Sequence, residues 1–281
     1  MNMMQKYLFG LIALVVLPAM SGAAANQSIK HVVGDAFGLK SNDLIYRETH
    51  CGTQDELASE VFYQLRDGTL IAHKELDYKS GLMSPSFVQH NIQSKEKIKV
   101  SFDQEVVSMS VTDYDNQGSK NTFPVTDTVS KPIVIDAGFD GFIRDNWDQL
   151  VAGKTLEFQF PLASRSSMVS LQVKPLGCSY ETATDQCFTL EPSNWFFRML
   201  ASPIELGYDS NLARLTRYRG LSNINDESGK GLVVDIRYRY QAIAGTACNI
   251  DTRGFAAITG GFYGCCLANL RPRAHAAARS V

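Results

Sequence analysis

The sequence predicts a mainly β protein: a bent antiparallel sheet or half-barrel meander with one or two amphipathic helices packed on its concave face. Short apolar segments separated by tight turns recur between residues 43 and 241, and each is close enough to pair with the next. No crossover helix interrupts this succession, so parallel pairing is not required. Two aromatic-rich segments have helical spacing and need an apolar surface to cover.

The strand signals begin with a hairpin, in which segments 61–65 and 69–78 flank Asp67-Gly68, a strong signal for a tight turn. Segment 106–114 is the next strand and ends in a polar turn. Segment 155–160 is expected to pair with segment 168–174. The last expected strands form an antiparallel meander, and they are 203–208, 213–224 and 232–240.

The last of these strands alternates clearly between an apolar and a polar face. Its polar face carries Arg237 and Arg239, which are expected beside Arg217 and Arg219 of the preceding strand. Two interpretations stay open. A solvated face with acidic neighbours is favoured, and a patch for an anionic lipid or polymer is the alternative.

Segment 139–151 has the apolar arc of an amphipathic helix, with Asp136 placed to begin it and Gly153 to end it. Ser193 is placed to cap a second short helix that contains Trp195 and Phe196 and stops before Pro203. Both helices are expected to bury aromatic side chains against the sheet.

Residues 1–25 have the order of a secretory signal peptide: Lys6, an apolar run, the breaker Pro18 and a small-residue cleavage site ending at Ala25. The apolar run is shorter than the roughly 20 residues that span a bilayer. We therefore expect an exported, periplasmic protein with no transmembrane span after cleavage.

Residues 242–281 differ in kind from the chain before them, with ten Ala, five Gly, four Arg and the single acid Asp251. Neither strand alternation nor a helical stripe runs through them. We therefore expect a disordered or atypical tail after one β-rich domain of residues 26–241.

The charge balance argues against nucleic-acid binding. Removing residues 1–25 takes away Lys6 and no acid, so 26 basic and 29 acidic side chains remain. General nucleic-acid binding depends on a basic excess that this chain lacks.

The cysteines fit an oxidising compartment. Cys178 and Cys187 flank a polar turn-like segment, so we expect a short loop closed by a disulfide. Zinc ligation is the alternative, but no second pair or nearby His completes a tetrahedral site, and no metal is expected. The sequence does not determine how the remaining cysteines pair, and these are Cys51, Cys248, Cys265 and Cys266.

No catalytic constellation is evident, because nucleophile elbows, metalloprotease helices and phosphate-cradling glycine motifs are all missing from the sequence. No cofactor is expected. The acidic residues near the first helix could serve a glycoside-type hydrolase, although helical spacing points them in different directions, and they are Asp136, Asp140, Asp145 and Asp148. Capping and solvation are the simpler account of these carboxylates.

A curved sheet over aromatic helices makes a concave apolar site, which favours a binding function. Six aromatic side chains are the candidates to line it, or else to form a dry core: Phe139, Phe142, Trp147, Trp195, Phe196 and Tyr218. An outer-membrane barrel is disfavoured, because aromatic helices interrupt the apolar band that lipid contact requires.

Residues 134–150 (VIDAGFDGFIRDNWDQL) and 218–226 (YRGLSNIND), with Leu44–Glu48 (LIYRE), resemble an uncharacterised family of exported proteobacterial proteins. More remotely, the C-terminal meander is similar to domain of unknown function 3108, a relative of periplasmic lipoprotein carriers. The resemblance spans about residues 43–240 and implies a half-barrel around a hydrophobic groove. We therefore expect a non-enzymatic carrier of an apolar or lipid-like ligand, with an envelope hydrolase as the alternative.

If the signal peptide is cleaved after Ala25, the mature protein begins at Asn26. Expression of the full chain in a Gram-negative host, followed by N-terminal sequencing of the soluble protein, measures this directly. Soluble protein that still begins at Met1 would contradict export.

Overall fold

The computed structural model describes residues 31–52, 58–114, 118–124, 131–180, 185–199 and 202–241; the expected signal peptide and tail lie outside these ranges. Within them, fourteen strands form one antiparallel sheet, which confirms the predicted fold class. The strands are β1 His31–Gly38, β2 Leu44–Cys51, β3 Ala58–Gln64, β4 Leu70–Asp77, β5 Ser86–Asn91, β6 Glu96–Asp103, β7 Val106–Asp113, β8 Ser119–Pro124, β9 Leu156–Leu162, β10 Ser167–Leu176, β11 Asp185–Pro192, β12 Ile204–Asp209, β13 Arg214–Asn225 and β14 Gly231–Gln241.

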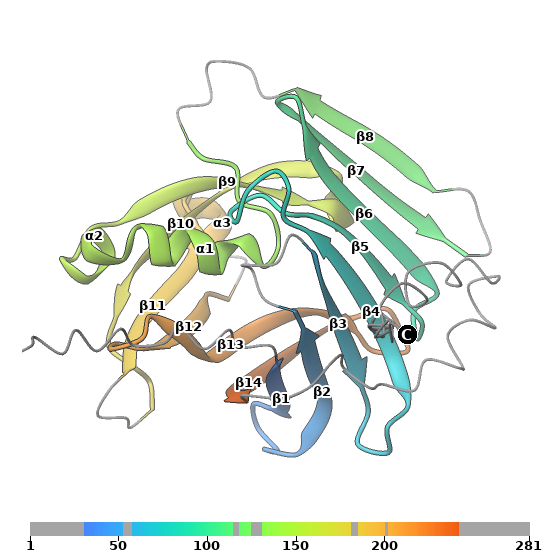
Figure 1. Ribbon diagram of the computed structural model, residues 1–281, viewed down its shortest axis with the longest axis horizontal. Helices are drawn as coiled ribbons and strands as arrows, with labels where there is room; N and C mark the ends of the chain where they lie inside the picture. Colours follow the sequence, from blue (N-terminus) through green and yellow to red (C-terminus); the bar gives the residue numbers. More distant parts are fainter. Residues whose placement is uncertain are drawn as a thin grey trace, which may run out of the picture.

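The order of strands in the sheet is β8-β7-β6-β5-β4-β3-β2-β1-β14-β13-β12-β11-β10-β9. The first strand therefore lies beside the last, and this pair joins two meanders into one curved sheet (Figure 1). The two edges, β8 and β9, are not hydrogen-bonded to each other, so the sheet is barrel-like but not closed.

Helices α1 (Gly138–Asp145) and α2 (Trp147–Val151) lie on the concave side of the sheet, below β9 and above β12 and β13 in Figure 1. A single helix over 139–151 was predicted, and this is wrong in one respect. Asn146 leaves helical geometry, at φ −111° and ψ 18°, and its side-chain amide donates to the Phe142 carbonyl at 2.9 Å. An Asn that bonds to its own backbone competes with the helix in this way. Gly153 follows α2 at φ +95°, as expected of a helix terminator.

Two glycines let α1 approach the β4–β5 loop closely. A Cβ on Gly138 would lie 2.0 Å from the Met83 carbonyl oxygen, and one on Gly141 would lie 3.1 Å from that of Leu82. The backbone amide of Ile135 also donates to the Met83 carbonyl, at 2.9 Å. The loop and the start of α1 thus pack backbone against backbone.

The seam between β8 and β9 is bridged by the segment before α1. Val134 donates to the Gln159 carbonyl and Gln159 donates to the Pro132 carbonyl, at 2.9 and 2.8 Å, which ties the segment to β9. The short 3₁₀ turn η1 (Ala163–Arg165) after β9 contacts β6 and β7 on the other side of the seam. Packing and a few backbone bonds therefore hold the seam, in place of a continuous ladder.

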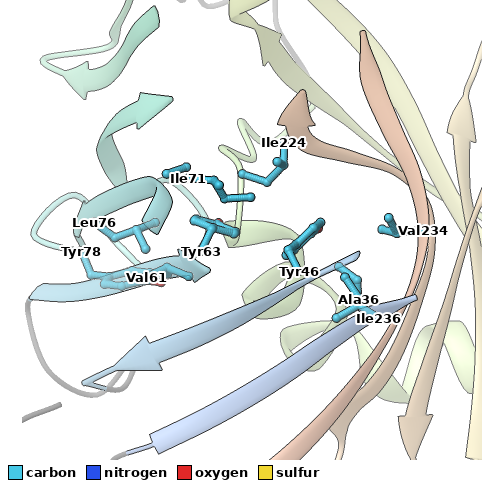
Figure 2. Close-up of a cluster of buried hydrophobic side chains, with 11 residues drawn as sticks. Ala36, Tyr46, Val61, Tyr63, Ile71, Leu76, Tyr78, Ile224, Val234 and Ile236 are labelled. Atoms are coloured by element: carbon cyan, nitrogen blue, oxygen red, sulfur yellow. The ribbon is translucent and has the colours of Figure 1, made fainter. Parts of the chain in front are cut away.

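The apolar interior divides into three clusters. One lies where β1–β4 meet β13 and β14, and Figure 2 shows its side chains pointing toward one another, Tyr46 and Tyr63 among them. A second packs α1 and α2 on β9–β13 around Phe158 and Phe188. A third lies at the seam around Met109 and Ile135.

The predicted hairpin and the C-terminal meander are confirmed. β3 pairs with β4 across Asp67-Gly68, where the Thr69 amide donates to Asp67 Oδ1 at 2.9 Å. β9 pairs with β10, and β12–β14 pair in succession. Six strands were not identified from the sequence, and they are β1, β2, β5, β6, β8 and β11. In β1, two glycines weaken the usual strand signal.

Gly34 on β1 occupies a place where a side chain does not fit. A Cβ there would lie 2.8 Å from side-chain atoms of Glu48, Ile236 and Tyr238, which come from both neighbouring strands. Glycine therefore allows large residues of β2 and β14 to meet across β1.

We expect Gly34→Ala to lower the free energy of unfolding by about 1–3 kcal/mol, the usual cost of overpacking a well-packed interior. Chemical denaturation measures the change. Gly177→Ala is the matched control, because nothing lies within 4 Å of its Cβ position. Equal stability of the two variants would show that the interior beside β1 yields to an added methyl group.

Candidate functional site

Four of the six predicted ligand-lining residues lie together on the concave side. Phe139 and Phe142 come from α1, Trp147 begins α2, and Tyr218 lies on β13. All four belong to or pack against the cluster around Phe158 and Phe188, and we call them the aromatic wall. The centroid distances are 4.9 Å for Phe142–Phe158, 5.6 Å for Trp147–Phe188, 5.8 Å for Trp147–Tyr208 and 6.4 Å for Phe139–Tyr218. Phe142 is buried, whereas Phe139, Trp147 and Tyr218 are half-buried.

Trp195 and Phe196 do not belong to this wall, so the expectation that they line the same site is wrong. They lie on the single-turn helix α3 (Trp195–Arg198) after β11, with 66% and 54% of their surfaces exposed. The cap of α3 is Asn194, which accepts from the Phe196 amide at 2.9 Å. Ser193 instead donates its hydroxyl to the Ser170 carbonyl on β10. This anchoring, and the shortness of the helix, leave the rings at the surface.

A buried ion pair lies beside the aromatic wall. Lys74 of β4 is 2% exposed, and its Nζ donates to both carboxylate oxygens of Asp136, at 2.8 and 2.7 Å. The same Nζ lies 5.2 Å from the centre of the Phe87 ring. Asp136 has φ 46°, a left-handed conformation that turns the chain into α1. It was expected to cap the helix, but the cap position is Ala137 and no side chain caps it.

A second buried acid, Glu48 of β2, lies in a group of tyrosines. It is 4% exposed, and its Oε1 lies 3.0 Å from Nε2 of His50. Burial raises the pKa of Tyr63 and Tyr218, and the negative charges of Glu48 and Asp136 raise it further. These phenols therefore stay protonated and can act as hydrogen-bond donors inside the sheet.

The four acidic residues near the first helix differ in burial and in their partners. Asp136 is bound to Lys74, and Asp140 lies 3.1 Å from the guanidinium of Arg144. Asp145 and Asp148 are exposed. Two carboxylates thus face inward and are neutralised by cations, while two face solvent. This division disfavours the paired carboxylates that a glycoside-type hydrolase would need.

A pocket of about 330 Å³ opens beside α1, at the seam of the sheet. Its walls come from the β4–β5 loop, the end of β6 and the segment that bridges to β9. The apolar lining residues are Leu82, Met83, Phe102, Pro132 and Ile133, and the polar ones include Ser80, Ser84 and Asp145. The Ser84 hydroxyl already forms a hydrogen bond within the protein, since it donates to the Ile133 carbonyl at 2.6 Å.

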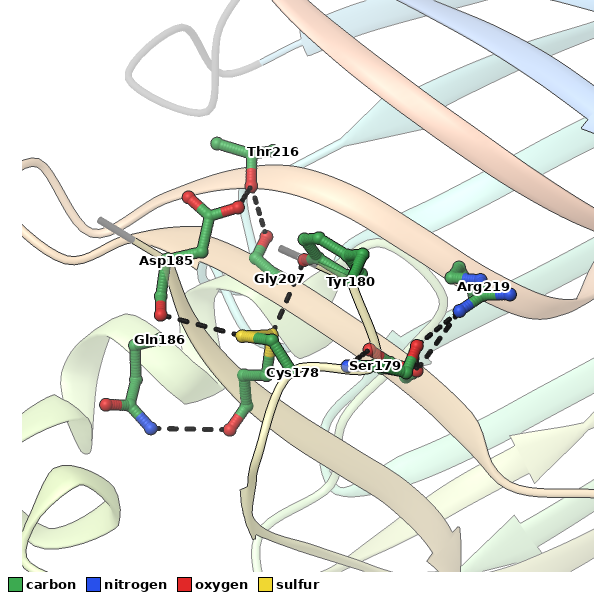
Figure 3. Close-up of a disulfide and its surroundings, with 10 residues drawn as sticks. Cys178, Ser179, Tyr180, Asp185, Gln186, Gly207, Thr216 and Arg219 are labelled. Carbon is green, nitrogen blue, oxygen red and sulfur yellow. Dashed lines mark hydrogen bonds and ion pairs between the residues drawn. A yellow bond between two sulfur atoms is a disulfide. The ribbon is translucent and has the colours of Figure 1, made fainter. Parts of the chain in front are cut away.

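Cys178 and Cys187 form a disulfide that closes the loop between β10 and β11. Figure 3 shows the adjoining Ser179 and Tyr180 lying over β12 and β13, where Gly207 makes room for the tyrosine ring. Cys51 is also disulfide-bonded. Cys248, Cys265 and Cys266, whose pairing the sequence left open, lie outside the described residues.

Sequence reasoning missed Lys74 and Glu48, which carry the buried charge of the site. A weak signal was present for Lys74, because Ala72, Lys74 and Leu76 share the inward face of an otherwise apolar strand.

In the part of the chain that the structure describes, no group of three or more His, Cys, Asp and Glu residues is placed to hold a metal ion. No helix in the described ranges is long and apolar enough to span a membrane.

The fold and the site define a barrel-like antiparallel β protein with a helix on its concave side. No family model matches the chain, so its resemblance to domain of unknown function 3108 remains a prediction. No curated protein matches it either. Among solved structures, it is similar to a beta-barrel-like protein of domain of unknown function DUF1849 from Brucella abortus. The two chains are 6% identical over 75% of this chain and 96% of that one, with a TM-score of 0.39.

We expect Lys74→Met to lower the free energy of unfolding by about 3–5 kcal/mol, because it leaves the Asp136 charge without its buried partner. The double variant Lys74→Met with Asp136→Asn should lose clearly less than the sum of the two single changes. A double-mutant cycle from denaturation curves measures this coupling.

The matched control is the exposed pair of Lys79 and Asp77, whose nitrogen–oxygen distance is 3.1 Å. The same cycle on that pair should give well under about 1 kcal/mol, because solvent screens it. A coupling at Lys74 no larger than at Lys79 would contradict a structural role for the buried pair.

Proposed function

We propose that the protein is an exported, non-enzymatic binding or carrier protein, and that its ligand is apolar or lipid-like and enters through the seam beside α1. The observation that carries this proposal is the apolar pocket between the β4–β5 loop and the bridging segment. Its volume of about 330 Å³ lies at the lower end of the range of small-molecule sites.

The chemistry of the lining supports an apolar ligand. Leu82, Met83 and Phe102 present hydrocarbon and thioether surface, and polar groups stand among them in the minority. Burial of apolar surface in such a site contributes about 25 cal/mol per Å² removed from water. A ligand with an acyl chain and one polar end matches this distribution.

The residues behind the pocket would let a ligand reach further into the apolar interior if they moved aside. Met83 packs on the cluster around α1 and α2, and Ile133 belongs to the cluster at the seam. Both side chains therefore separate the pocket from apolar interior. Methionine is flexible and adapts to irregular space, so its displacement by a ligand costs little.

The seam is also where the sheet can widen most easily. Elsewhere in the described sheet, neighbouring strands are paired along much of their length, whereas the bridging segment relies on the bonds of Val134, Gln159 and Ile135. Regions with few backbone bonds open at lower free energy than continuous ladders. This property suits a site that takes up and releases a ligand.

An envelope hydrolase that uses acidic residues near α1 receives less support. Its two inward carboxylates, Asp136 and Asp140, are each held by a cation. The pocket at the seam includes Asp145, but the remaining polar lining groups are serines.

We expect Leu82→Glu to weaken binding of a fluorescent fatty-acid analogue at least tenfold, because a charge placed in an apolar wall must be desolvated when the ligand binds. Fluorescence titration of the purified protein measures the affinity. Leu212→Glu is the matched control, since Leu212 is also exposed and lies on the distant β12–β13 turn.

The control should bind the probe as the unchanged protein does, and thermal unfolding should show both variants folded. If the protein without substitutions binds no apolar probe, the proposal is wrong. The same conclusion would follow if Leu82→Glu and Leu212→Glu bound equally well.

A further inference from the structure

The outer face of β2, β1, β14 and β13 carries an array of arginines, which we call the arginine platform. It consists of Arg47, Arg217, Arg219, Arg237 and Arg239. Strand register places Arg237 directly opposite Arg217 and next to Asp35 on the other side. Like charges directly opposite each other are unfavourable unless something between them compensates.

Two buried aspartates organise the platform, and each holds two arginines. Asp35 accepts from Arg47 at 2.7 Å and from Arg239 at 2.6 Å. Asp235 accepts from Arg217 at 2.7 and 2.6 Å and from Arg237 at 3.1 Å. Burial opposes ionisation of both carboxyls, but the arginine hydrogen bonds outweigh it and lower the pKa of each.

Aromatic rings hold the guanidinium groups further in place. The Arg237 guanidinium lies 4.4 Å from the centre of the Phe37 ring, and that of Arg217 lies 3.9 Å from the Tyr180 ring. Such contacts reduce the rotamer freedom that a long side chain would lose on binding. The platform is thus ordered before any ligand arrives.

The platform keeps a cationic excess, and its cations remain accessible. The side chains of Arg47, Arg237 and Arg239 are 47%, 42% and 51% exposed, whereas both aspartates are under 10% exposed. With Glu205, which lies 3.7 Å from Arg219, and Asp185, which accepts from Thr216 of β13, the five arginines face four acids. The chain as a whole has a net charge of −2, so this local excess is opposite in sign to that of the protein.

An exposed apolar pair continues the same face. Leu221 pairs with Val233 on β13 and β14, two residues beyond the pair of Arg219 and Asp235. Leu221 is 54% exposed and Val233 is 48% exposed, and Leu39, which directly follows β1, is 43% exposed. Cationic and apolar side chains therefore lie side by side on the outside of the sheet.

We propose that the arginine platform and the adjoining Leu221–Val233 pair dock the protein on the surface of an anionic phospholipid bilayer. A bilayer offers phosphate groups and an apolar boundary next to each other, whereas a soluble polyanion offers charge alone. Guanidinium groups bind phosphate oxygens in a bidentate manner. This docking does not depend on whether the pocket at the seam carries a ligand.

The test is co-sedimentation with vesicles of phosphatidylglycerol and phosphatidylcholine, and with vesicles of phosphatidylcholine alone. The unchanged protein should bind the anionic vesicles, and raised salt should weaken binding. The double variant Arg47→Gln with Arg237→Gln should bind about thirtyfold less, which corresponds to about 1 kcal/mol for each arginine. It should still fold, because Asp35 keeps Arg239 and Asp235 keeps Arg217.

The matched control is Arg66→Gln with Lys99→Gln. It removes one exposed cation from the β3–β4 turn and one from β6, and it should leave binding unchanged. A second variant, Leu221→Ser with Val233→Ser, should weaken binding to vesicles and leave the platform intact. Fatty-acid binding of all these variants should match that of the unchanged protein, which separates this proposal from the function of the pocket.

Three results would overturn docking on a bilayer. The first is that the unchanged protein does not sediment with anionic vesicles at low salt. The second is equal loss in the control variant, which would mean that only net charge matters. The third is binding to soluble polyphosphate as strong as to vesicles, with no effect of the serine variant, which would identify a polyanion site instead.

Discussion

The pairing of β1 with both β2 and β14 is the constraint on which the rest of the structure depends. It joins the first described strand to the last, so two meanders that could otherwise fold apart become one curved sheet. Gly34 makes this possible, because Glu48 and Tyr238 from the two neighbouring strands occupy the space above it. The inner face of this junction holds the buried acid and its tyrosines, and the outer face holds the arginine platform.

The interior helix depends on a second, more local constraint. Asp136 adopts a left-handed conformation and binds Lys74 from a strand 62 residues earlier, which fixes where α1 begins. Removing a charged pair from water is costly, so the pair specifies position more than it adds stability. With Gly138 against the β4–β5 loop, it places the helix beside the seam and shapes one side of the pocket.

These two constraints give the inner and outer faces of the sheet different capacities. On the inside, apolar side chains surround a few buried polar groups, among them Lys74 bound to Asp136 and Glu48 beside His50. On the outside, two aspartates gather four arginines into a rigid cationic surface. The proposed carrier role and the proposed bilayer docking thus rest on separate faces of the curved sheet.

The sequence by itself determined the β class, the hairpin at Asp67-Gly68, the C-terminal meander and the helical character around Phe142, because turn residues and alternation are local properties. It also indicated the Cys178–Cys187 loop. Contacts between distant residues decided the rest: that β1 meets β14, that Lys74 binds Asp136 in place of a helix cap, and that Trp195 stays outside. No local pattern encodes such pairings, since each depends on the free energy of burying two segments together after the chain has folded back on itself.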